Sequence, residues 1–373
     1  MKVGVSSVPL EPPPGLPMAG YIDRTDVNHG VLDPLEVLAF VVEDRGRSLA
    51  LVVADLLGIP DGLMWENVGV DFVIPIATHT HSGPSPELMR EKLLRAGEEA
   101  ISKACTQSEE VVSVEVMRFP VRDVCSRRDI NDPSPLEAGL ISWHRRRRPP
   151  IYLLFFGCHP TVLGPENTMY SGDLAACIRR ALSRKYGGTI LYLNSCAGNI
   201  STHYTRRSRT YAEIERLTEV FLDQVPSGPW RQVEINPLSW QTSQVELPVV
   251  PRAALTPVDE RASVGARLAR SRAPSFLERV RTAEIAFLRL GEIGIFFHPF
   301  ELFLSTCSVI TSALKGVLAE PFVVGYAMAY RPYIVPVGRE GTYEWFASVY
   351  APDAEEVLLV AVRDLIKKVF NQE

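Results

Sequence analysis

The apolar run at residues 72–76 ends in a polar turn that carries two histidines, His79 and His81. The run has the composition of a buried strand, and α/β proteins place their chemistry at such strand ends. On an extended chain, side chains two residues apart point to the same side, so both imidazoles are expected to address one point. Because the sequence holds only seven histidines, this pair predicts a metal site or a proton-transfer site.

Short apolar runs alternate with helical stretches along the rest of the sequence. Hairpins are predicted for residues 38–42 with 49–54, residues 139–143 with 151–156, and residues 283–290 with 293–297. Helices are predicted over residues 86–103, 174–186, 211–225, 301–318 and 353–369. This alternation predicts an α/β fold of layered, mixed β-sheets flanked by helices, with the site at strand ends.

We interpret residues 1–373 as one domain, because the sequence contains no internal repeat or low-complexity tract. Residues 226–274 are rich in Pro, Ser and Arg and predict an insertion or a lid. The sequence does not indicate an oligomeric state.

The composition narrows the class of protein. The chain is 46% hydrophobic with a formal net charge of -5, and this mild acidity argues against nucleic acid as a partner, since phosphate binding requires a basic face. No apolar stretch reaches the roughly 18 residues of a membrane helix. Residues 1–9 lack the apolar core of a signal peptide. The six cysteines are scattered without a Cys-x-x-Cys pair, which predicts buried free thiols in the cytoplasm.

Further polar motifs follow other predicted strands. His159 comes directly after an apolar run, and a third imidazole would suit zinc. Ser201 lies in a loop of small residues that lets the backbone approach a ligand closely. The other candidates have equally good structural explanations. Asp173 and Glu301 lie where carboxylates commonly occupy the first turn of a helix, and Tyr333 lies in a loop where tyrosines commonly pack.

Taken in chain order, these motifs resemble those of the neutral/alkaline, non-lysosomal ceramidase family. The family's Thr-His-Thr-His-Ser-Gly-Pro run is present at residues 78–84, and its His-Pro-Thr and Ser-Gly-Asp motifs at residues 159–161 and 171–173. Its Gly-Asp-Val-Ser loop, Pro-Gly-Glu turn and Tyr-x-x-Tyr-Ile segment are matched, in whole or in part, at residues 198–201, 299–301 and 330–334. Asn199 replaces the family's Asp, and Phe300 replaces its Gly.

The resemblance implies a zinc amidase site. The implied zinc ligands are His79, His159, Glu301 and Tyr333. By the same resemblance, His81 hydrogen-bonds the substrate amide or the developing oxyanion, and Ser201 lies beside the metal at the scissile carbonyl. Arg127 is the residue to which we transfer the family's substrate-contacting arginine. Asp55, from its position at the end of another predicted strand, is a candidate to orient a ligand histidine.

We therefore expect a zinc-dependent hydrolase of an amide C–N bond, in which zinc-bound water attacks the carbonyl. The substrate is a small-molecule or lipid amide, and we do not expect specificity for ceramide itself to be retained. Two alternatives stay open: a hydrolase with Ser201 as nucleophile, or a metal- or ligand-binding relative without catalysis. The cavity above the metal discriminates between substrates, because a long apolar groove fits a lipid amide and a small polar pocket excludes it.

Overall fold

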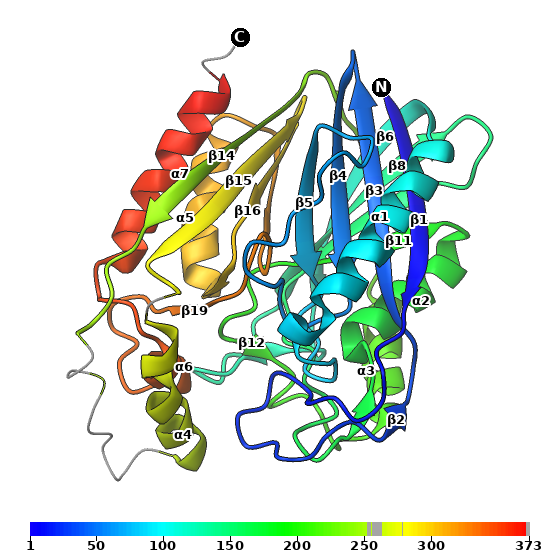
Figure 1. The fold of residues 1–373 in the computed structure, drawn as a ribbon. Helices are drawn as coiled ribbons and strands as arrows, with labels where there is room; N and C mark the ends of the chain where they lie inside the picture. The colour runs from blue at the N-terminus through cyan, green and yellow to red at the C-terminus, as the bar shows by residue number, and fades with distance from the viewer. Residues whose placement is uncertain (252–254, 256–262, 278, 371–373) are drawn as a thin grey trace.

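Two β-sheets packed face to face form the centre of the molecule (Figure 1). A computed structural model of the chain describes residues 1–251, 255, 263–277 and 279–370. The larger sheet runs in the order β11 (Thr189–Asn194), β9 (Ile151–Phe156), β8 (Leu136–Arg145), β6 (Glu109–Val121), β1 (Lys2–Leu10), β3 (Leu35–Asp44), β4 (Arg47–Ala54) and β5 (Phe72–Ala77), with β13 (Arg231–Gln232) paired to β6. The smaller sheet runs in the order β14 (Leu238–Glu246), β15 (Thr282–Leu290), β16 (Ile293–Phe297) and β18 (Glu320–Val324).

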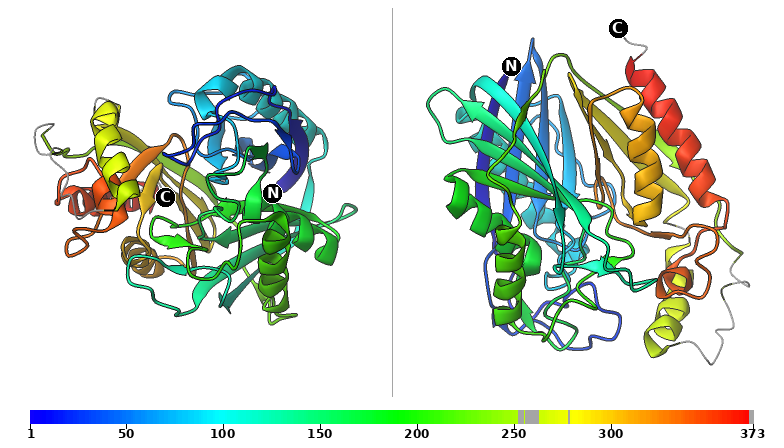
Figure 2. Two further views of the ribbon diagram at one scale, coloured as in Figure 1. Left: turned by 90° about the horizontal axis from the view of Figure 1, so that it is seen from below. Right: turned by 180° about the vertical axis from the view of Figure 1, so that it is seen from behind.

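Helices cover the outer face of each sheet (Figures 1 and 2). Against the larger sheet lie η1 (Pro86–Met89) with α1 (Arg90–Thr106), which packs on β1 and β3, and the pair α2 (Asp173–Tyr186) and α3 (Tyr211–Asp223). Against the smaller sheet lie α5 (Leu304–Lys315) and α7 (Ala354–Phe370). The predicted α/β fold of layered mixed sheets flanked by helices is confirmed.

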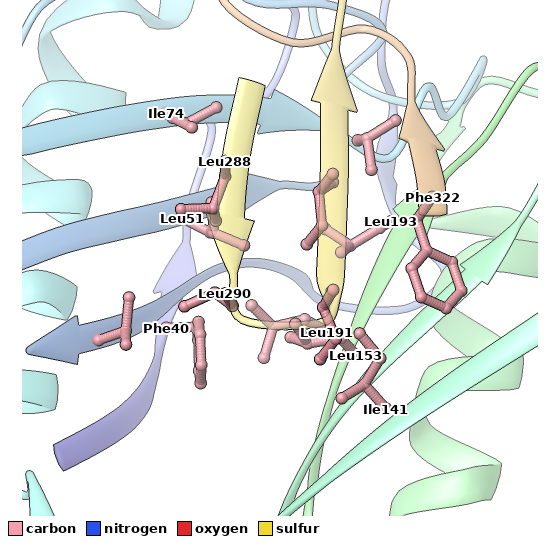
Figure 3. Close-up of a cluster of buried hydrophobic side chains, with 14 of the residues drawn as sticks. Phe40, Leu51, Ile74, Ile141, Leu153, Leu191, Leu193, Leu288, Leu290 and Phe322 are labelled. Carbon is pink, nitrogen blue, oxygen red and sulfur yellow. The ribbon is translucent and has the colours of Figure 1, made fainter. Parts of the chain in front are cut away.

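The main hydrophobic core fills the space between the two sheets (Figure 3). Phe40 and Leu51 from the larger sheet face Leu288 from the smaller one, and all three side chains are fully buried. The rings of Phe155 and Phe322 stack across the same interface with centroids 4.1 Å apart. Each such side chain contributes about 1.5–3 kcal/mol on burial. Packing of strand residues therefore holds the sheets, and the loops at their ends, in a fixed relation.

Parallel strand pairs bring several strand ends to one edge. The pairs are β4 with β5, β9 with β11, and β16 with β18. The segment after β18 crosses between the sheets, because the Gly325 amide donates to the Asn194 carbonyl and the Ala77 amide donates to the Tyr326 carbonyl. The loops that follow β5, β9 and β11 thus meet a segment of the smaller sheet.

Short strands and helices complete this edge. They are β2 (Gly30–Val31) with β10 (Met169–Tyr170), β7 (Ser126–Arg127) with β12 (Ile200–Ser201), β17 (Phe300–Leu302) with β19 (Arg331–Ile334), and the helices α4 (Val264–Arg272), η3 (Ala273–Phe276) and α6 (Tyr343–Ala347). In Figure 1 they lie below the two large sheets. Among the described residues, no helix combines the length and apolar character needed to cross a membrane.

The predicted hairpins are confirmed as the antiparallel pairs β3–β4, β8–β9 and β15–β16. The helix predicted over residues 301–318 is wrong at its start, because Glu301 lies in β17 and α5 begins only at Leu304. Within residues 226–274, where an insertion or a lid is predicted, β14 pairs with β15 along its whole length and so belongs to the smaller sheet. Part of that segment, residues 252–254 and 256–262, lies outside the described residues.

Two of the six cysteines do not have the free thiols predicted for them. Cys196 and Cys307 form a disulfide that closes a separation of 111 residues. Cys105, Cys125, Cys158 and Cys177 are free, as predicted. Spacing along the chain could not reveal the bridge, because it joins the loop after β11 to α5 only in the folded protein.

Candidate active site

His79 lies just beyond β5 in a left-handed backbone conformation, with φ of +67°. This conformation is rare for a residue with a side chain and marks a locally constrained position. The chain is therefore not extended here, and the predicted strand geometry does not bring the two histidines together. A tight turn does so instead. The His79 ring is stacked on Tyr326 at a centroid distance of 3.8 Å, and its Nδ1 lies 2.7 Å from the Leu57 carbonyl oxygen.

His159 enters the same site from the end of β9. Its amide donates to the Ile200 carbonyl at 3.0 Å, and its Nδ1 lies 2.6 Å from the Ala197 carbonyl oxygen. A carbonyl oxygen only accepts, so both His79 and His159 carry their proton on Nδ1. The Nε2 atom of each ring therefore faces the Glu301 carboxylate and is the atom that can act as a metal ligand in the neutral imidazole.

Glu301 reaches the two histidines from β17, on the side of the smaller sheet. Its two carboxylate oxygens lie 3.0 Å from the Nε2 of His79 and 3.4 Å from the Nε2 of His159. The hydroxyls of Tyr326 and Tyr330 donate to the same carboxylate at 2.8 and 3.1 Å. Burial opposes ionisation of Glu301, but the two histidines outweigh it and hold the pKa of the carboxyl well below its usual range.

His81 approaches the cluster differently from the other two histidines. Its Nε2 lies 3.3 Å from the Nε2 of His79, whereas its Nδ1 is buried and has no hydrogen-bond partner among the described residues. The ring packs edge-on to Tyr21. Gly20, at φ of +104°, allows this approach, because a Cβ there would lie 2.5 Å from the His81 ring.

The donor set fits a zinc ion. One nitrogen from each of His79, His81 and His159 lies within 4.8 Å of the others. The Glu301 carboxylate joins this group through His79 and His159, and His159 Nε2 lacks a properly directed hydrogen bond. Burial is the main cause that lowers the pKa of His159, which favours the neutral imidazole that a metal requires. Imidazole nitrogens with one carboxylate are a common zinc donor set.

Tyr333 lies in the wall of a cavity that opens beside His81 and His159. Its hydroxyl accepts a hydrogen bond from Arg128 Nη2 at 3.1 Å, and burial is the main cause that raises its pKa well above the usual range. Among the described contacts, the hydroxyl makes no hydrogen bond to the histidines or to Glu301. The role of Tyr333 as a ligand therefore stays a prediction.

Ser201 is brought beside His159, with which it forms a parallel bridge, and it lines the cavity. Its Oγ accepts a hydrogen bond from the His203 amide at 3.2 Å. Within the described part of the chain, no imidazole or carboxylate is hydrogen-bonded to this hydroxyl. An activated serine nucleophile requires such a base.

The structure does not bring Arg127 into the cavity. Its guanidinium pairs with Asp132, whereas the next residue, Arg128, lines the cavity. Arg128 Nε donates to Glu344 at 2.6 Å, and Nη2 donates to the Gly198 carbonyl at 2.8 Å. The two residues are neighbours in the Cys-Ser-Arg-Arg run, so the sequence alone does not distinguish them.

Asp55 and Asp173 support the site without pointing into it. Asp55 Oδ1 accepts from the hydroxyl of Thr78, the residue before His79, and Oδ2 accepts from Arg179. Asp55 therefore holds the backbone before His79 and does not touch an imidazole, contrary to the expected orienting contact. Asp173 accepts from the amides of Val162 and Leu163 and so fixes the loop that follows His159.

A cavity of about 630 Å³ opens beside the histidines. The residues that sequence reasoning missed are Arg128 and Glu344 in its wall, Tyr21 against His81, and Tyr326 and Tyr330 on Glu301. Of these, Tyr330 belongs to the Tyr-x-x-Tyr segment and could have been found from it. Part of the segment expected to form a lid borders the cavity, through Gly265 of α4.

No family model and no curated protein matches the sequence. Solved structures do match the fold. A structure described as ceramidase complexed with C2 has a TM-score of 0.78 and 15% sequence identity, covering 100% of this chain and 75% of that one. The neutral ceramidase from Pseudomonas aeruginosa has a TM-score of 0.75 and 17% identity, covering 98% of this chain and 73% of that one. The chain therefore has a neutral-ceramidase-like fold.

Proposed function

We propose that this chain is a zinc-dependent hydrolase of an amide bond. One observation carries the proposal: His79, His159 and Glu301 converge from two different sheets, and both imidazoles have Nδ1 fixed by a backbone carbonyl. A buried cluster of this kind, with Nε2 atoms directed at one carboxylate, is expected where a metal is bound. The likeness to ceramidase structures supports an amide as the substrate.

When bound, zinc supplies Lewis-acid polarisation of the amide carbonyl and a hydrolytic water whose pKa falls toward ~7. His79, His159 and Glu301 would hold the ion. Tyr333 is kept as a fourth ligand candidate because it lies in the cavity wall. The hydroxyls of Tyr326 and Tyr330 fix the orientation of the Glu301 carboxylate.

His81 is the residue we assign to the proton transfers. It lines the cavity, and its Nδ1 has no partner in the described structure. This ring can accept a proton from the attacking water and return it to the departing amine nitrogen. Arg128, which is paired with Glu344, donates to the Tyr333 hydroxyl and so orients that hydroxyl in the cavity wall.

The alternatives of a serine nucleophile and of a non-catalytic relative are less well supported. Ser201 has no base on its hydroxyl among the described residues, although it lies close enough to His159 to position the carbonyl or the water. His79, His159 and Glu301 lie together, and their Nδ1 and carboxylate groups are hydrogen-bonded. These contacts suit metal binding with or without catalysis, and it is His81 in the adjoining cavity wall that adds the acid–base group needed for turnover.

The proposal is tested by loading and removing the metal. Purified protein is expected to contain about one zinc per chain by elemental analysis and to release amine from a panel of N-acyl amides. Chelation should abolish turnover, and stoichiometric zinc should restore it. Zinc binding without turnover on any amide would support the non-catalytic relative, and turnover that persists in metal-free protein would contradict the proposal.

A further inference from the structure

Polar, charged and tyrosine residues predominate among those that line the cavity. The aliphatic side chains that line it are those of Ile22 and Pro165, and its aromatic residues are tyrosines. Among the described lining residues there is no Leu, Val, Met or Phe. Each buried CH₂ group gains about 0.8 kcal/mol only against an apolar wall. A long acyl or sphingoid chain would therefore have to pack mainly on tyrosine rings and on the methylene groups of charged residues, without a continuous aliphatic wall.

Most charged side chains in the wall are already paired. Arg128 lies 2.6 Å from Glu344, and Arg209 lies 2.6 Å from Glu166. These guanidinium groups have their charge compensated before any substrate enters.

The carboxylates of the cavity wall either contact other residues of the protein or lie exposed at the edge of the cavity. Asp129 accepts from Asn199 Nδ2 at 2.8 Å and lies 3.5 Å from Arg339. Asp23 is exposed to solvent at the edge of the cavity. Neither carboxylate pairs with Arg206.

Arg206 is the cation of the wall that lacks a carboxylate partner. Its Nη1 donates to the Thr161 carbonyl at 2.7 Å, and no carboxylate of the described residues lies within ion-pair distance of it. Thr161 is two residues from His159, and the hydroxyl of Tyr21 donates to the same carbonyl. The positive charge of Arg206 is therefore fixed close to the metal-binding loop.

The electrostatics of neighbouring groups agree with this placement. Burial is the main cause that lowers the pKa of His203, and Arg206 is the charged residue that contributes most to the same shift. An additional anion at this point would relieve the repulsion between them. The half-buried guanidinium keeps further N–H donors available for a planar, two-oxygen acceptor.

We propose that the amide substrate carries a carboxylate that binds to Arg206, and that it is a compact N-acyl amino acid or dicarboxylic monoamide instead of a long-chain lipid amide. This inference rests on the proposed hydrolase function. It deepens that function by naming the substrate class. The carboxylate sits on either the amine or the acyl side of the scissile bond, and the test separates the two.

The test uses two matched pairs of compounds that differ in one charge. N-acetylglycine carries the carboxylate on the amine side, and N-acetylglycinamide is its neutral partner. N-propylsuccinamate carries the carboxylate on the acyl side, and N-propylbutanamide is its neutral partner. Calorimetry with the purified zinc-loaded protein should show at least one carboxylate binding about 10- to 100-fold more tightly than its neutral partner, as a charged hydrogen-bonded pair implies. N-palmitoylsphingosine should be turned over more slowly than the preferred carboxylate.

Arg206→Gln should abolish the preference for the carboxylate, and Arg206→Lys should retain part of it, because the charge stays and the planar fork is lost. Arg207→Gln is the matched control: it makes the same charge change on the neighbouring residue, which is exposed and outside the cavity wall. It should keep the full preference.

The outcomes separate this inference from the hydrolase function. Equal binding of both members of each pair, or a preference that survives in Arg206→Gln, overturns the inference even if amides are hydrolysed. A preference that depends on Arg206 without turnover of any amide overturns the hydrolase function and leaves Arg206 as the binding site of a carboxylate ligand.

Discussion

The Nδ1 atom of His159 lies 2.6 Å from the carbonyl oxygen of Ala197. This contact joins the loop after β9 to the loop after β11, and it fixes the tautomer of a buried ring. His79 has an equivalent contact with the Leu57 carbonyl, whereas His81 has none on its Nδ1 among the described residues. Although three imidazoles cluster together, only two of them are held in the way expected of metal ligands.

Replacing single histidines tests this difference. His79→Ala and His159→Ala should each lose most of the bound zinc, because these two rings, oriented by backbone carbonyls on Nδ1, carry the affinity. His81→Ala should retain about one zinc per chain and lose turnover by roughly 10²- to 10⁴-fold, the usual contribution of a general acid–base group. Elemental analysis and amide turnover on the same samples decide the assignment. Loss of zinc in His81→Ala would place His81 on the metal.

Gly20→Ala tests the position of the His81 ring without removing it. A Cβ at this site would lie 2.5 Å from the ring, so the ring must move, and turnover should fall by about 10- to 100-fold. Zinc content should not change. Gly15→Ala is a matched control, since Gly15 also has a positive φ of +78° but no described atom within 4 Å of the added Cβ. Equal turnover losses in the two variants would show that backbone strain alone is responsible.

Glu344→Gln should destabilise the fold by removing the charge that compensates Arg128. Glu344 is 1% exposed and its oxygen lies 2.6 Å from Arg128 Nε. A buried charge left without its partner costs about 3 kcal/mol, measurable as a lower denaturant midpoint. Glu87→Gln breaks an exposed pair with Arg90 and should cost under about 1 kcal/mol. Similar losses in both variants would contradict the buried role of Glu344.

Asp173 makes the stability depend on pH. Burial raises the pKa of its carboxyl from 3.8 to about 6, against the opposing effect of backbone hydrogen bonds. Because the folded pKa lies above the unfolded one, the folded state binds the proton more tightly, and stability rises as the pH falls from about 7 to 5. In metal-free protein this gain should be roughly 1 kcal/mol larger in the wild type than in Asp173→Asn. An identical pH dependence of the unfolding midpoint in both proteins would contradict the shift.

The sequence predicts well those features that depend on neighbours along the chain. The hairpin β3–β4 is encoded by two apolar runs around a polar turn, and its register matches that pattern. His79 and His159 each follow an apolar strand directly, so their place at a strand end can be predicted without the fold. The ordering of the motifs pointed to the ceramidase-like fold that the comparison of structures shows.

Features that depend on long-range packing could not be predicted. The sequence predicts Glu301 at a helix start, but it lies in β17, because the parallel partner β19 is provided by residues 31 or 32 positions later. Whether Arg127 or Arg128 faces the cavity depends on the short pairing of β7 with β12. The convergence of His79 and His81 depends on a left-handed residue that no sequence pattern at this position requires.

The ligand cluster lies at the interface between the two sheets, with His79 and His159 on one side and Glu301 on the other. An ion bound by all three residues would link the two sheets to each other. It could bind tightly only while the sheets stay docked, so binding and docking would favour each other thermodynamically. Metal loading would then stabilise contacts far from the cavity. This would be measured as slower amide hydrogen exchange along β16 and β11.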